Sequence, residues 1–492
     1  MDTPNDQSNN YYDVLIVGAG ISGINAAYRL QEQTPDHTYA ILEARDSIGG
    51  TWDLFRYPGI RSDSDLHTFG FPFRPWTEPR AIADGPSIKK YMQETASIYG
   101  IDKHIKYHHK LITANWSSDA QSWSLTVETA GETRYFHSKF LLLATGYYNY
   151  DEALPAKIPG IENFQGTTIH PQFWPEDLDY AGKNVVIIGS GATAVTLLPN
   201  LAKEAAHVTM LQRSPSYILS LPQQDSISYW ARRLLPKTWA YKLIRTRFLV
   251  LPFLFFKFCR SFPNAARTLL QKGAAKQLPI DYSIKPNFDP KYDPWEQRLC
   301  ISPNGDFYKA IADGNAEVVT AHIKQVTEKS IHLEETDRVI TPDIIITATG
   351  LKLQIAGGAK ISVDNEQIKI PEKHLWKGCM LQDVPNAAVV IGYTNASWTL
   401  GSDATAQFIT RLLNYNKKHG FTSAVPRLED PDSVKEVQVL NLNSTYVVRA
   451  KGDLPKAGDK APWLPRSTYF TDLFEAKFGS ITSGMQFSRV ST

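Results

Sequence analysis

Two stretches of the chain share one order of apolar and polar positions. In each, a short run rich in Val, Ile or Leu leads into a glycine-rich turn, a helical stretch and a second apolar run. The first runs span residues 12–17 and 184–188, and the second runs span residues 39–42 and 208–211. Strand, turn, helix and strand in this order are typical of a βαβ unit, whose two strands lie parallel in one sheet. The sequence therefore predicts an α/β fold with two such units.

Other short apolar runs, at residues 140–143, 344–346 and 388–391, predict further strands that lead into glycine-containing turns. Residues 221–298 are instead rich in aromatic residues, Arg and Pro and show no strand pattern, so we expect a mainly helical insert there. A chain of 492 residues has room for about three domains.

Both glycine-rich turns fit the dinucleotide-binding fingerprint GxGxxG or its GxGxxA form. The glycines allow a tight turn and let the backbone approach a pyrophosphate, which the positive end of the following helix stabilises. In the first unit the second strand ends in an acid, at the position where a carboxylate hydrogen-bonds a ribose diol. The candidate contacts of this first site are Gly18, Gly20, Ser22, Gly23 and Glu43.

The second unit has Gln212 at the position that matches Glu43, followed by Arg213 and Ser214. A carboxylate there would repel a 2′-phosphate, whereas a guanidinium and a hydroxyl would bind it. We therefore expect NADPH at this site, with the candidate contacts Gly189, Gly191, Thr193, Ala194, Arg213 and Ser214.

The first site has no such reader of a 2′-phosphate, which makes FAD its natural occupant. The pair of sites indicates a flavoprotein that NADPH reduces. We expect two Rossmann-like domains with a mainly helical insert, divided as follows: 1–146 FAD-binding, 147–182 linker, 183–220 NADP-binding, 221–298 helical insert, 299–384 NADP-binding again, and 385–492 FAD-binding again with a C-terminal segment.

Composition narrows the choice of electron acceptor. The 52 Lys and Arg residues nearly balance the 50 Asp and Glu residues, which argues against a nucleic-acid partner. The cysteines, Cys259, Cys300 and Cys379, form no pair at the spacing of a metal site or a dithiol centre, so we expect neither. Dioxygen or a soluble carrier remains. The sparse cysteines and the polar start Met1–Asp6 favour a cytoplasmic location.

Two longer motifs resemble one enzyme family. Residues 49–63, GGTWDLFRYPGIRSD, are similar to the flavin-side signature GGxWxxxxYPGxxxD of Baeyer–Villiger monooxygenases. The second motif matches that family's FxGxxxHxxxWP fingerprint at Phe164, Gly166, His170, Trp174 and Pro175. The resemblance extends over nearly the whole chain. Residues 50–63, 146–151 and 392–399 further resemble the ethionamide-activating subgroup of the family.

The resemblance implies an enzyme in which NADPH reduces FAD and O2 then forms a flavin C4a-peroxide. As an anion, the peroxide would insert oxygen next to the carbonyl of an apolar ketone and give an ester or lactone. Once protonated, it would oxidise the sulfur of a thioether or thioamide. Two alternatives stay open: an N- and S-oxygenating flavin monooxygenase that uses the hydroperoxyflavin, and a flavin-dependent redox sensor without an oxygenated product. Trp174, Pro175 and Arg298 favour the ketone reaction.

The resemblance also implies roles for single residues. Arg298 lies where the family places its active-site arginine, and a guanidinium keeps its charge near neutral pH. Asp63 matches the family's active-site aspartate and is expected to pair with Arg298; a turn cap is the alternative. We interpret His170 as a structural pin of the linker and not as a base. Further candidate cofactor contacts are Gly50, Thr51, Trp52, Asp53, Asp63, Thr145, Gly146, Thr349 and Gly350.

The substrate side is marked by a continuous apolar run at residues 248–256. We interpret the run as a buried helix or a cavity wall, with a weak association with a membrane surface as the alternative. Its aromatic residues, and Trp398, are candidates for a substrate pocket, although ordinary core packing is the favoured interpretation: Phe253, Phe255, Phe256 and Trp398. Trp463 is a candidate contact of NADP.

Overall fold

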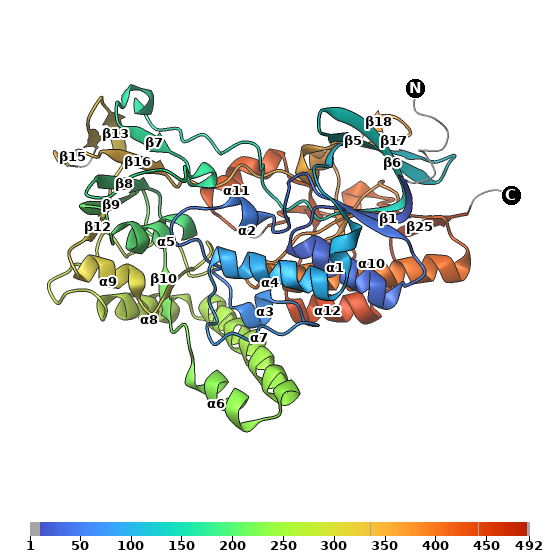
Figure 1. Ribbon diagram of the computed structural model, residues 1–492, viewed down its shortest axis with the longest axis horizontal. Helices are drawn as coiled ribbons and strands as arrows, with labels where there is room; N and C mark the ends of the chain where they lie inside the picture. Colours follow the sequence, from blue (N-terminus) through green and yellow to red (C-terminus); the bar gives the residue numbers. More distant parts are fainter. Residues whose placement is uncertain (1–9, 335, 441, 490–492) are drawn as a thin grey trace.

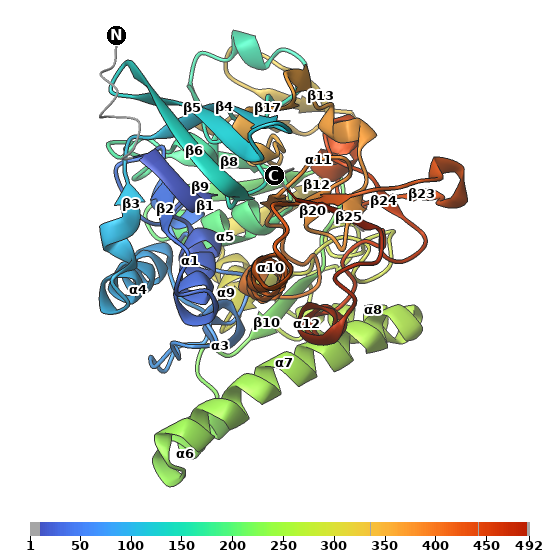
Figure 2. The same cartoon turned by 90° about the vertical axis from the view of Figure 1, so that its right-hand side faces the viewer.

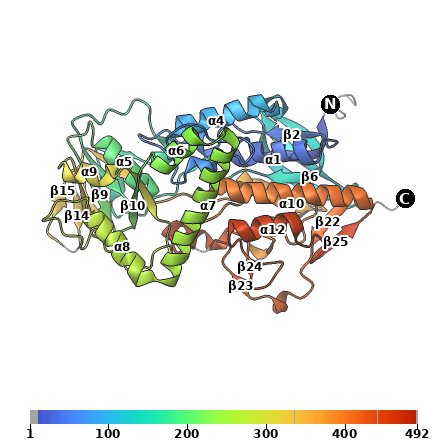
Figure 3. The ribbon, with the colours of Figure 1, turned by 90° about the horizontal axis from the view of Figure 1, so that it is seen from below.

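The computed structural model describes residues 10–334, 336–440 and 442–489. The polar start Met1–Asp6, on which the expected cytoplasmic location partly depends, lies outside these ranges. Figure 1 shows two α/β domains side by side, each built on its own sheet. A long helix, α7 (Lys237–Ser261), runs across the lower side of the molecule where the two domains meet (Figure 1, Figure 3).

The first domain is built on a large mixed sheet with the strand order β18-β17-β4-β5-β6-β1-β2-β3, and β21 joins it beside β6. Val14 and Ile16 of β1 pack into one buried core, whereas Leu15 and Val17 pack into the core on the opposite face. This alternation explains the continuous apolar run, because both faces of the sheet are covered. The strands are β1 (Tyr11–Val17), β2 (Tyr39–Leu42), β3 (Ile105–Lys106), β4 (Lys110–Ser117), β5 (Ser122–Thr129), β6 (Glu132–Leu143), β17 (Lys360–Val363), β18 (Glu366–Gln367) and β21 (Ala387–Val389).

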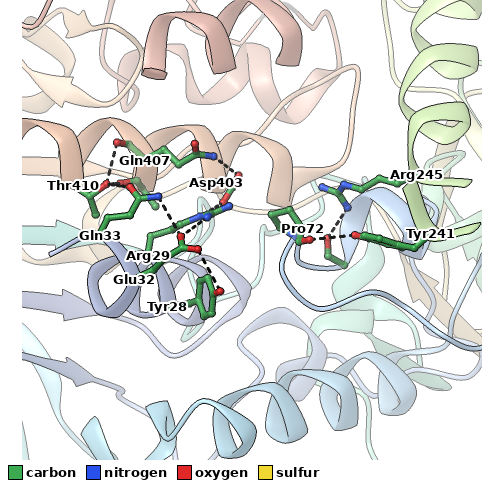
Figure 4. A network of polar contacts seen from close by, with 12 residues as sticks. Tyr28, Arg29, Glu32, Gln33, Pro72, Tyr241, Arg245, Asp403, Gln407 and Thr410 are labelled. Carbon is green, nitrogen blue, oxygen red and sulfur yellow. Dashed lines mark hydrogen bonds and ion pairs between the residues drawn. The ribbon is translucent and has the colours of Figure 1, made fainter. Parts of the chain in front are cut away.

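Helices cover one face of this sheet, and polar contacts join α1 to the longest of them, α10. Arg29 Nε of α1 donates to Asp403 Oδ1 of α10 at 2.8 Å, and Thr410 Oγ1 of α10 donates to Gln33 Oε1 at 2.6 Å (Figure 4). These bonds tie the first helix of the chain to a helix from its last quarter. The helices of this domain are α1 (Ile21–Gln33), α2 (Thr51–Leu54), α3 (Leu66–Phe69), α4 (Gly85–Ile98) and α10 (Trp398–His419).

The second domain has a parallel sheet with the strand order β12-β9-β8-β16-β7. Its helices α5 and α9 pack on one face, and the small antiparallel sheet β13-β14-β15 lies beside it. The elements are β7 (Thr167–Ile169), β8 (Asn184–Ile188), α5 (Ala192–Leu201), β9 (His207–Gln212), α9 (Asp306–Ala312), β12 (Ala316–Thr320), β13 (Ile323–Val326), β14 (Ile331–Leu333), β15 (Val339–Ile340) and β16 (Ile344–Thr347). The predicted α/β class is confirmed.

The insert between β9 and β12 is mainly helical, as predicted. Figure 2 shows α6 at the outer end of the straight helix α7, away from the body of the molecule. Between the described residues, no helix is long and apolar enough to cross a membrane. The insert contains β10 (Ile218–Leu221), α6 (Ser226–Leu234), α7, α8 (Pro263–Ala275) and β11 (Cys300–Pro303).

Two predicted domain boundaries need correction. The return to the first domain was expected at residue 385, but β17 already pairs with β4 of the first sheet. Leu353, Ile361 and Val384 also pack in the core of the first domain. The chain therefore returns to the first domain soon after β16. The sequence did not reveal this return, because β17 is a strand of only four residues with mixed polar and apolar positions. The expected linker 147–182 also supplies β7, an edge strand of the second sheet.

The C-terminal segment packs against the first domain through short strand pairs and two helices. Its elements are β19 (Leu375–Trp376), β20 (Met380–Leu381), β22 (Ser423–Pro426), β23 (Glu436–Val437), α11 (Thr445–Arg449), β24 (Ala457–Gly458), α12 (Tyr469–Phe478) and β25 (Met485–Ser488). Trp463 is buried in the core of the first domain, against Gly458.

The loop after α2 joins the two domains. Tyr57 is buried in the core of the second domain, although the neighbouring Gly50 faces Gly20 of the first. Gly59 has a φ of +78°, and a Cβ added there would lie 1.9 Å from Nδ2 of Asn200 on α5. Glycine is thus favoured at this contact by its backbone angle, and any side chain there would have to displace the amide group of Asn200.

We expect Gly59→Ala to lower the free energy of unfolding by about 2 to 4 kcal/mol, because it adds a clash to the backbone strain. The matched control is Gly100→Ala. Gly100 has a φ of +65°, but an added Cβ would meet nothing within 4 Å. Backbone strain alone should therefore lower the free energy of unfolding of this control, by about 1 to 2 kcal/mol. Thermal or urea unfolding of both variants measures the difference. Equal losses would show that the contact with Asn200 adjusts freely.

Candidate active site

The first glycine turn is shaped by close backbone contacts. Gly18 has a φ of +105°, and a Cβ on Gly23 would lie 1.9 Å from the carbonyl oxygen of Gly18. The N-terminus of α1 at Gly20 has no side-chain cap and no acid in its first turn, so its free N–H groups suit an anion. Glu43 is buried at the end of β2, and its carboxylate accepts a 2.6 Å bond from the N–H of Ala19.

The second glycine turn has the same form. Gly189 has a φ of +140°, and α5 begins after Gly191 without a side-chain cap or an acid in its first turn. A Cβ on Gly191 would meet nothing within 4 Å, so the helix N-terminus opens onto free space. Ala194, at the last position of the fingerprint, is fully buried under the helix, and Thr193 hydrogen-bonds the hydroxyl of Tyr57.

The candidate 2′-phosphate readers lie at the end of β9. Arg213 and Ser214 are both exposed, and Arg213 donates to Thr445 Oγ1 of α11 at 3.1 Å. Gln212 is buried, and its amide donates to Asn287 O and Thr320 Oγ1 at 2.8 and 2.9 Å. The position that matches Glu43 is thus taken up by hydrogen bonds inside the second domain, and the next two side chains are exposed, where an anion can reach them.

A cavity of about 470 Å³ lies where the first domain, the insert and the C-terminal segment meet. Its polar wall comes from residues 63–65 and Arg298, and its apolar wall comes mainly from α7. Three of the four aromatic candidates line it: Phe253, Phe255 and Phe256. The favoured interpretation of these three as ordinary core is therefore wrong. Trp398 instead packs against Gly392 and donates to Ser22 Oγ.

Arg298 and Asp63 both line the cavity, but they do not form the direct ion pair that was expected. Arg298 Nη2 instead donates to Ser64 Oγ at 3.2 Å. Burial raises the pKa of Asp63, and the nearby charges of Arg298 and Arg61 oppose that rise. The two groups therefore interact through space. Arg61 makes its own ion pair with Asp306.

Asp65 is a cavity residue that the sequence interpretation missed. Its carboxylate caps α3 by accepting from the N–H of Thr68 at 2.8 Å, yet burial raises its pKa to about 6. The run Ser62–Asp65, which begins inside the first signature and extends two residues past it, was the available signal, because it places four small polar residues in a row. Ser64 and Asn395 also line the cavity.

The raised pKa of Asp65 predicts a pH dependence of stability. The folded chain keeps the proton up to about pH 6, whereas the unfolded chain loses it near 3.8. This stabilising contribution is therefore present below pH 3.8 and is lost as the pH rises through 6, up to about 3 kcal/mol in all. Asp65→Asn keeps the helix cap but cannot titrate, so its free energy of unfolding should not fall in this way. Relative to wild type, the variant should therefore become more stable between pH 4 and pH 7. Unfolding at both pH values tests this, and parallel profiles would contradict it.

Other residues of the first signature lie around α2. Trp52 is half-buried and meets Phe69 edge-on, and Thr51 Oγ1 accepts from the hydroxyl of Tyr148 at 2.8 Å. Asp53 is buried between Arg45 and Lys89, at 2.5 and 2.6 Å. Burial alone would raise the pKa of Asp53, but the hydrogen bonds from Lys89 and Arg45 lower it on balance. Asp53 thus joins α2 to α4.

The two domain crossings carry the remaining candidates. Thr145 and Gly146 follow β6, where Gly146 has a φ of +78° and faces the ring of Tyr150. Thr349 and Gly350 follow β16. The hydroxyl of Thr349 is buried without a hydrogen-bond partner, so it is free to bind a ligand.

The fingerprint residues lie away from the cavity and hold the linker. Phe164 and Trp174 pack on the cores of the second domain, and a Cβ on Gly166 would meet Asp343 O at 2.6 Å. His170 Nδ1 accepts from the N–H of Gln172 at 3.2 Å. Burial lowers the pKa of His170, opposed by a hydrogen bond with the backbone of Gly350. Pro175 follows directly. This placement supports the interpretation of His170 as a pin.

The described residues contain no cluster of His, Cys, Asp and Glu that could hold a metal. All three cysteines are free and buried. Two nucleotide-type helix N-termini and one apolar cavity with a guanidinium together define an oxidoreductase that pairs a flavin with a nicotinamide nucleotide.

Comparisons with known proteins identify the family. Residues 15–246 match the model described as pyridine nucleotide-disulphide oxidoreductase. The chain is 48% identical to the FAD-containing monooxygenase EthA of Mycobacterium tuberculosis over 97% of its length and 98% of that protein. It is 44% identical to the probable FAD-binding monooxygenase AlmA of Acinetobacter baylyi, over 94% and 93% of the two chains. The chain therefore belongs to the FAD-containing monooxygenases, as its motifs predicted.

Solved structures share the fold. The cyclohexanone monooxygenase of Rhodococcus sp. Phi1 bound to NADP⁺ superposes with a TM-score of 0.75, 19% identity, and coverage of 98% of this chain and 99% of that one. The OTEMO complex with FAD and NADP gives a TM-score of 0.74 at 19% identity, over 97% and 99% of the chains. Each has the two-domain architecture described above.

Proposed function

We propose that this chain is an NADPH-dependent Baeyer–Villiger monooxygenase of the cytoplasm. It inserts one oxygen atom of O2 next to the carbonyl of apolar ketones, which gives an ester or lactone, and it also oxidises the sulfur of thioethers or thioamides. The observation that carries the proposal is the cavity, in which the guanidinium of Arg298, beside Asp63, faces a wall of aromatic and aliphatic side chains. The other arginine of the lining, Arg247, is paired with Asp225. Weak association with a membrane surface is part of the proposal.

The residues around the first glycine turn fit FAD. Gly18, Gly20 and Gly23 bring the backbone close to a pyrophosphate at the N-terminus of α1, Ser22 lies in the first turn, and the buried Glu43 has lone pairs left for a ribose diol. Gly50, Thr51 and Trp52 lie beside this turn. When bound, reduced FAD supplies the activation of dioxygen.

The second turn fits NADPH. The open space at Gly191 accepts a pyrophosphate, and Arg213 and Ser214 supply a positive charge and a hydroxyl for a 2′-phosphate. The unpartnered hydroxyl of Thr349 and the adjacent Gly350 follow β16, which pairs with β8 of the second glycine turn. Both cofactors would thus approach the cavity from the carboxyl ends of parallel strands.

Arg298 stabilises the negative charge that develops on oxygen during attack on a ketone carbonyl. Its guanidinium is held by a hydrogen bond to Ser64, and the planar fork of an arginine suits an oxyanion. Asp63 lines the same cavity as Arg298, and the electrostatic interaction between the two groups is the basis of its proposed role in positioning Arg298. The apolar wall excludes water, which strengthens these interactions.

Product analysis tests the proposal. Purified enzyme receives NADPH, air, a long-chain methyl ketone and an aryl methyl thioether, and mass spectrometry identifies the products. An ester with oxygen next to the carbonyl is the expected result. Sulfoxide without ester would establish the N- and S-oxygenating alternative, and NADPH consumption without any oxygenated product would favour the redox sensor.

A further inference from the structure

The charged side chains of the arm formed by α6 and α7 are all positive. Residues 226–280 contain no aspartate and no glutamate, in a chain whose charges otherwise nearly cancel. The exposed cations on α6 and α7 are Arg233, Lys237, Lys242, Lys257 and Arg260. The arm therefore presents a purely basic outer surface, which attracts an anionic partner.

An apolar stripe lies among these cations. Trp239, Leu243, Leu254 and Phe262 recur at helical spacing along α7 and its end, with 66%, 47%, 54% and 61% of their surfaces exposed. On α6, Tyr229, Trp230 and Leu234 are also mostly exposed. An open hollow between α6 and α7 is lined mainly by apolar side chains, including Trp230 and Leu243. A soluble protein rarely leaves so much aromatic and aliphatic surface in one place uncovered.

The inner face of α7 is held firmly to the body. Arg245 Nη1 donates to His67 O and Gly70 O at 2.6 and 3.2 Å, and the hydroxyl of Tyr241 reaches Phe71 O and Pro72 O at 3.5 Å. Figure 4 shows both side chains pointing from α7 toward the chain at Pro72. The orientation of the helix is thus fixed, and its outer stripe is presented to the surroundings.

The arm also borders the candidate substrate cavity. Phe248 and Phe256 face the cavity, and Leu251 lines it while half of its own surface is exposed. Leu251 thus belongs both to the cavity wall and to the outer surface of α7, so at this point only the helix itself lies between the cavity and the surroundings. Whatever covers the outer stripe lies beside the cavity wall.

We propose that the α6–α7 arm docks on the surface of an anionic lipid bilayer, with α7 in the plane of the interface and its apolar stripe among the acyl chains. Basic residues that flank exposed Trp, Tyr and Leu match the composition of interfacial helices. The docking itself does not depend on the proposed function, but one consequence of it does. If the cavity binds apolar substrates, long ones would pass from the bilayer into it past Leu251.

The charge pattern favours lipid over other occupants. Two copies of this chain that met through the arm in a two-fold interface would bring like charges together. A nucleic acid would bind the cations but leave the apolar stripe in water. A bilayer with anionic headgroups satisfies both features at once.

Co-sedimentation with vesicles tests the docking. We compare the full-length holoenzyme on vesicles of phosphatidylglycerol and phosphatidylcholine with vesicles of phosphatidylcholine alone. The wild type should bind the anionic vesicles, more weakly at high salt. Trp239→Ser with Leu243→Ser, and separately Arg233→Glu with Lys237→Glu, should each lower the partition coefficient at least about ten-fold.

Matched controls carry the same changes elsewhere on the surface. They are Ile98→Ser with Tyr135→Ser, and Lys324→Glu with Lys329→Glu, all at exposed positions outside the arm. Failure of the wild type to prefer anionic vesicles would overturn the proposal, and so would equal losses in arm and control variants. Analytical ultracentrifugation tests self-association. If the wild type formed dimers, and the arm variants lost the dimers but kept their vesicle binding, the result would overturn the proposal in favour of self-association. Oxidation of a small water-soluble ketone, measured in parallel, separates these outcomes from failure of the proposed function.

Discussion

Arg298→Ala is expected to lower the turnover number for ester formation by about 10²- to 10³-fold, the usual effect of removing one stabiliser of a developing oxyanion. Arg298 is the cation of the cavity wall that lies beside Asp63, and its guanidinium is held there by Ser64. NADPH consumption should continue, because the nicotinamide-binding turn is a separate part of the chain. Ester yield per NADPH oxidised, measured by gas chromatography, is the quantity to follow.

Two further variants make this test specific. Arg298→Lys keeps a positive charge but loses the planar fork, so we expect an intermediate rate. Arg260→Ala removes an exposed arginine on α7 outside the cavity lining and should form ester at the wild-type rate. Ester formation by Arg298→Ala at the wild-type rate would remove this residue from the mechanism.

Arg213→Ala is expected to raise the KM for NADPH by about 10- to 100-fold, since a charge-assisted hydrogen bond contributes about 1.5 to 3 kcal/mol. The KM for NADH should hardly change, because NADH has no 2′-phosphate. The exposed guanidinium and the exposed Ser214 at the end of β9 are the reason for this selectivity. Steady-state kinetics with both coenzymes measures it.

Thr445→Val is the matched control, because Arg213 donates to the hydroxyl of Thr445 at 3.1 Å. The control removes this contact and leaves the charge, so the preference for NADPH should remain. If Arg213→Ala raised the KM values for NADPH and NADH equally, the residue would act by holding α11 and not by binding the 2′-phosphate.

The sequence predicted the parts of the fold whose signals are local. The strands at 12–17, 39–42 and 184–188 coincide with β1, β2 and β8 to within one residue. Their continuous apolar runs reflect burial on both sheet faces, and the glycines between strand and helix are required by backbone contacts a few residues away, as Gly23 over Gly18 shows. Such constraints are visible in a short window.

Features that depend on distant partners were not predicted. The antiparallel strands β4 and β5 carry mixed polar and apolar faces and gave no strong pattern, although Trp116 and Trp123 pack edge-on in the core. The bond of Arg298 to Ser64 joins residues 234 positions apart. Phe253, Phe255 and Phe256 face a cavity because Arg245 holds α7 to α3 and to Gly70 at its end, which no local pattern could reveal.

The interleaving of the chain sets the order in which the protein can be made. β6 ends at Leu143, but its neighbour β21 and the helix α10 that packs on α1 come only after residue 386. At ribosomal rates of about 5 to 20 residues per second, the nascent first domain waits roughly ten seconds to a minute for its missing strand and helix. During that time the surface of α1 that α10 will cover stays exposed. Chaperone capacity during translation, more than the stability of the finished enzyme, should therefore limit the yield of soluble protein.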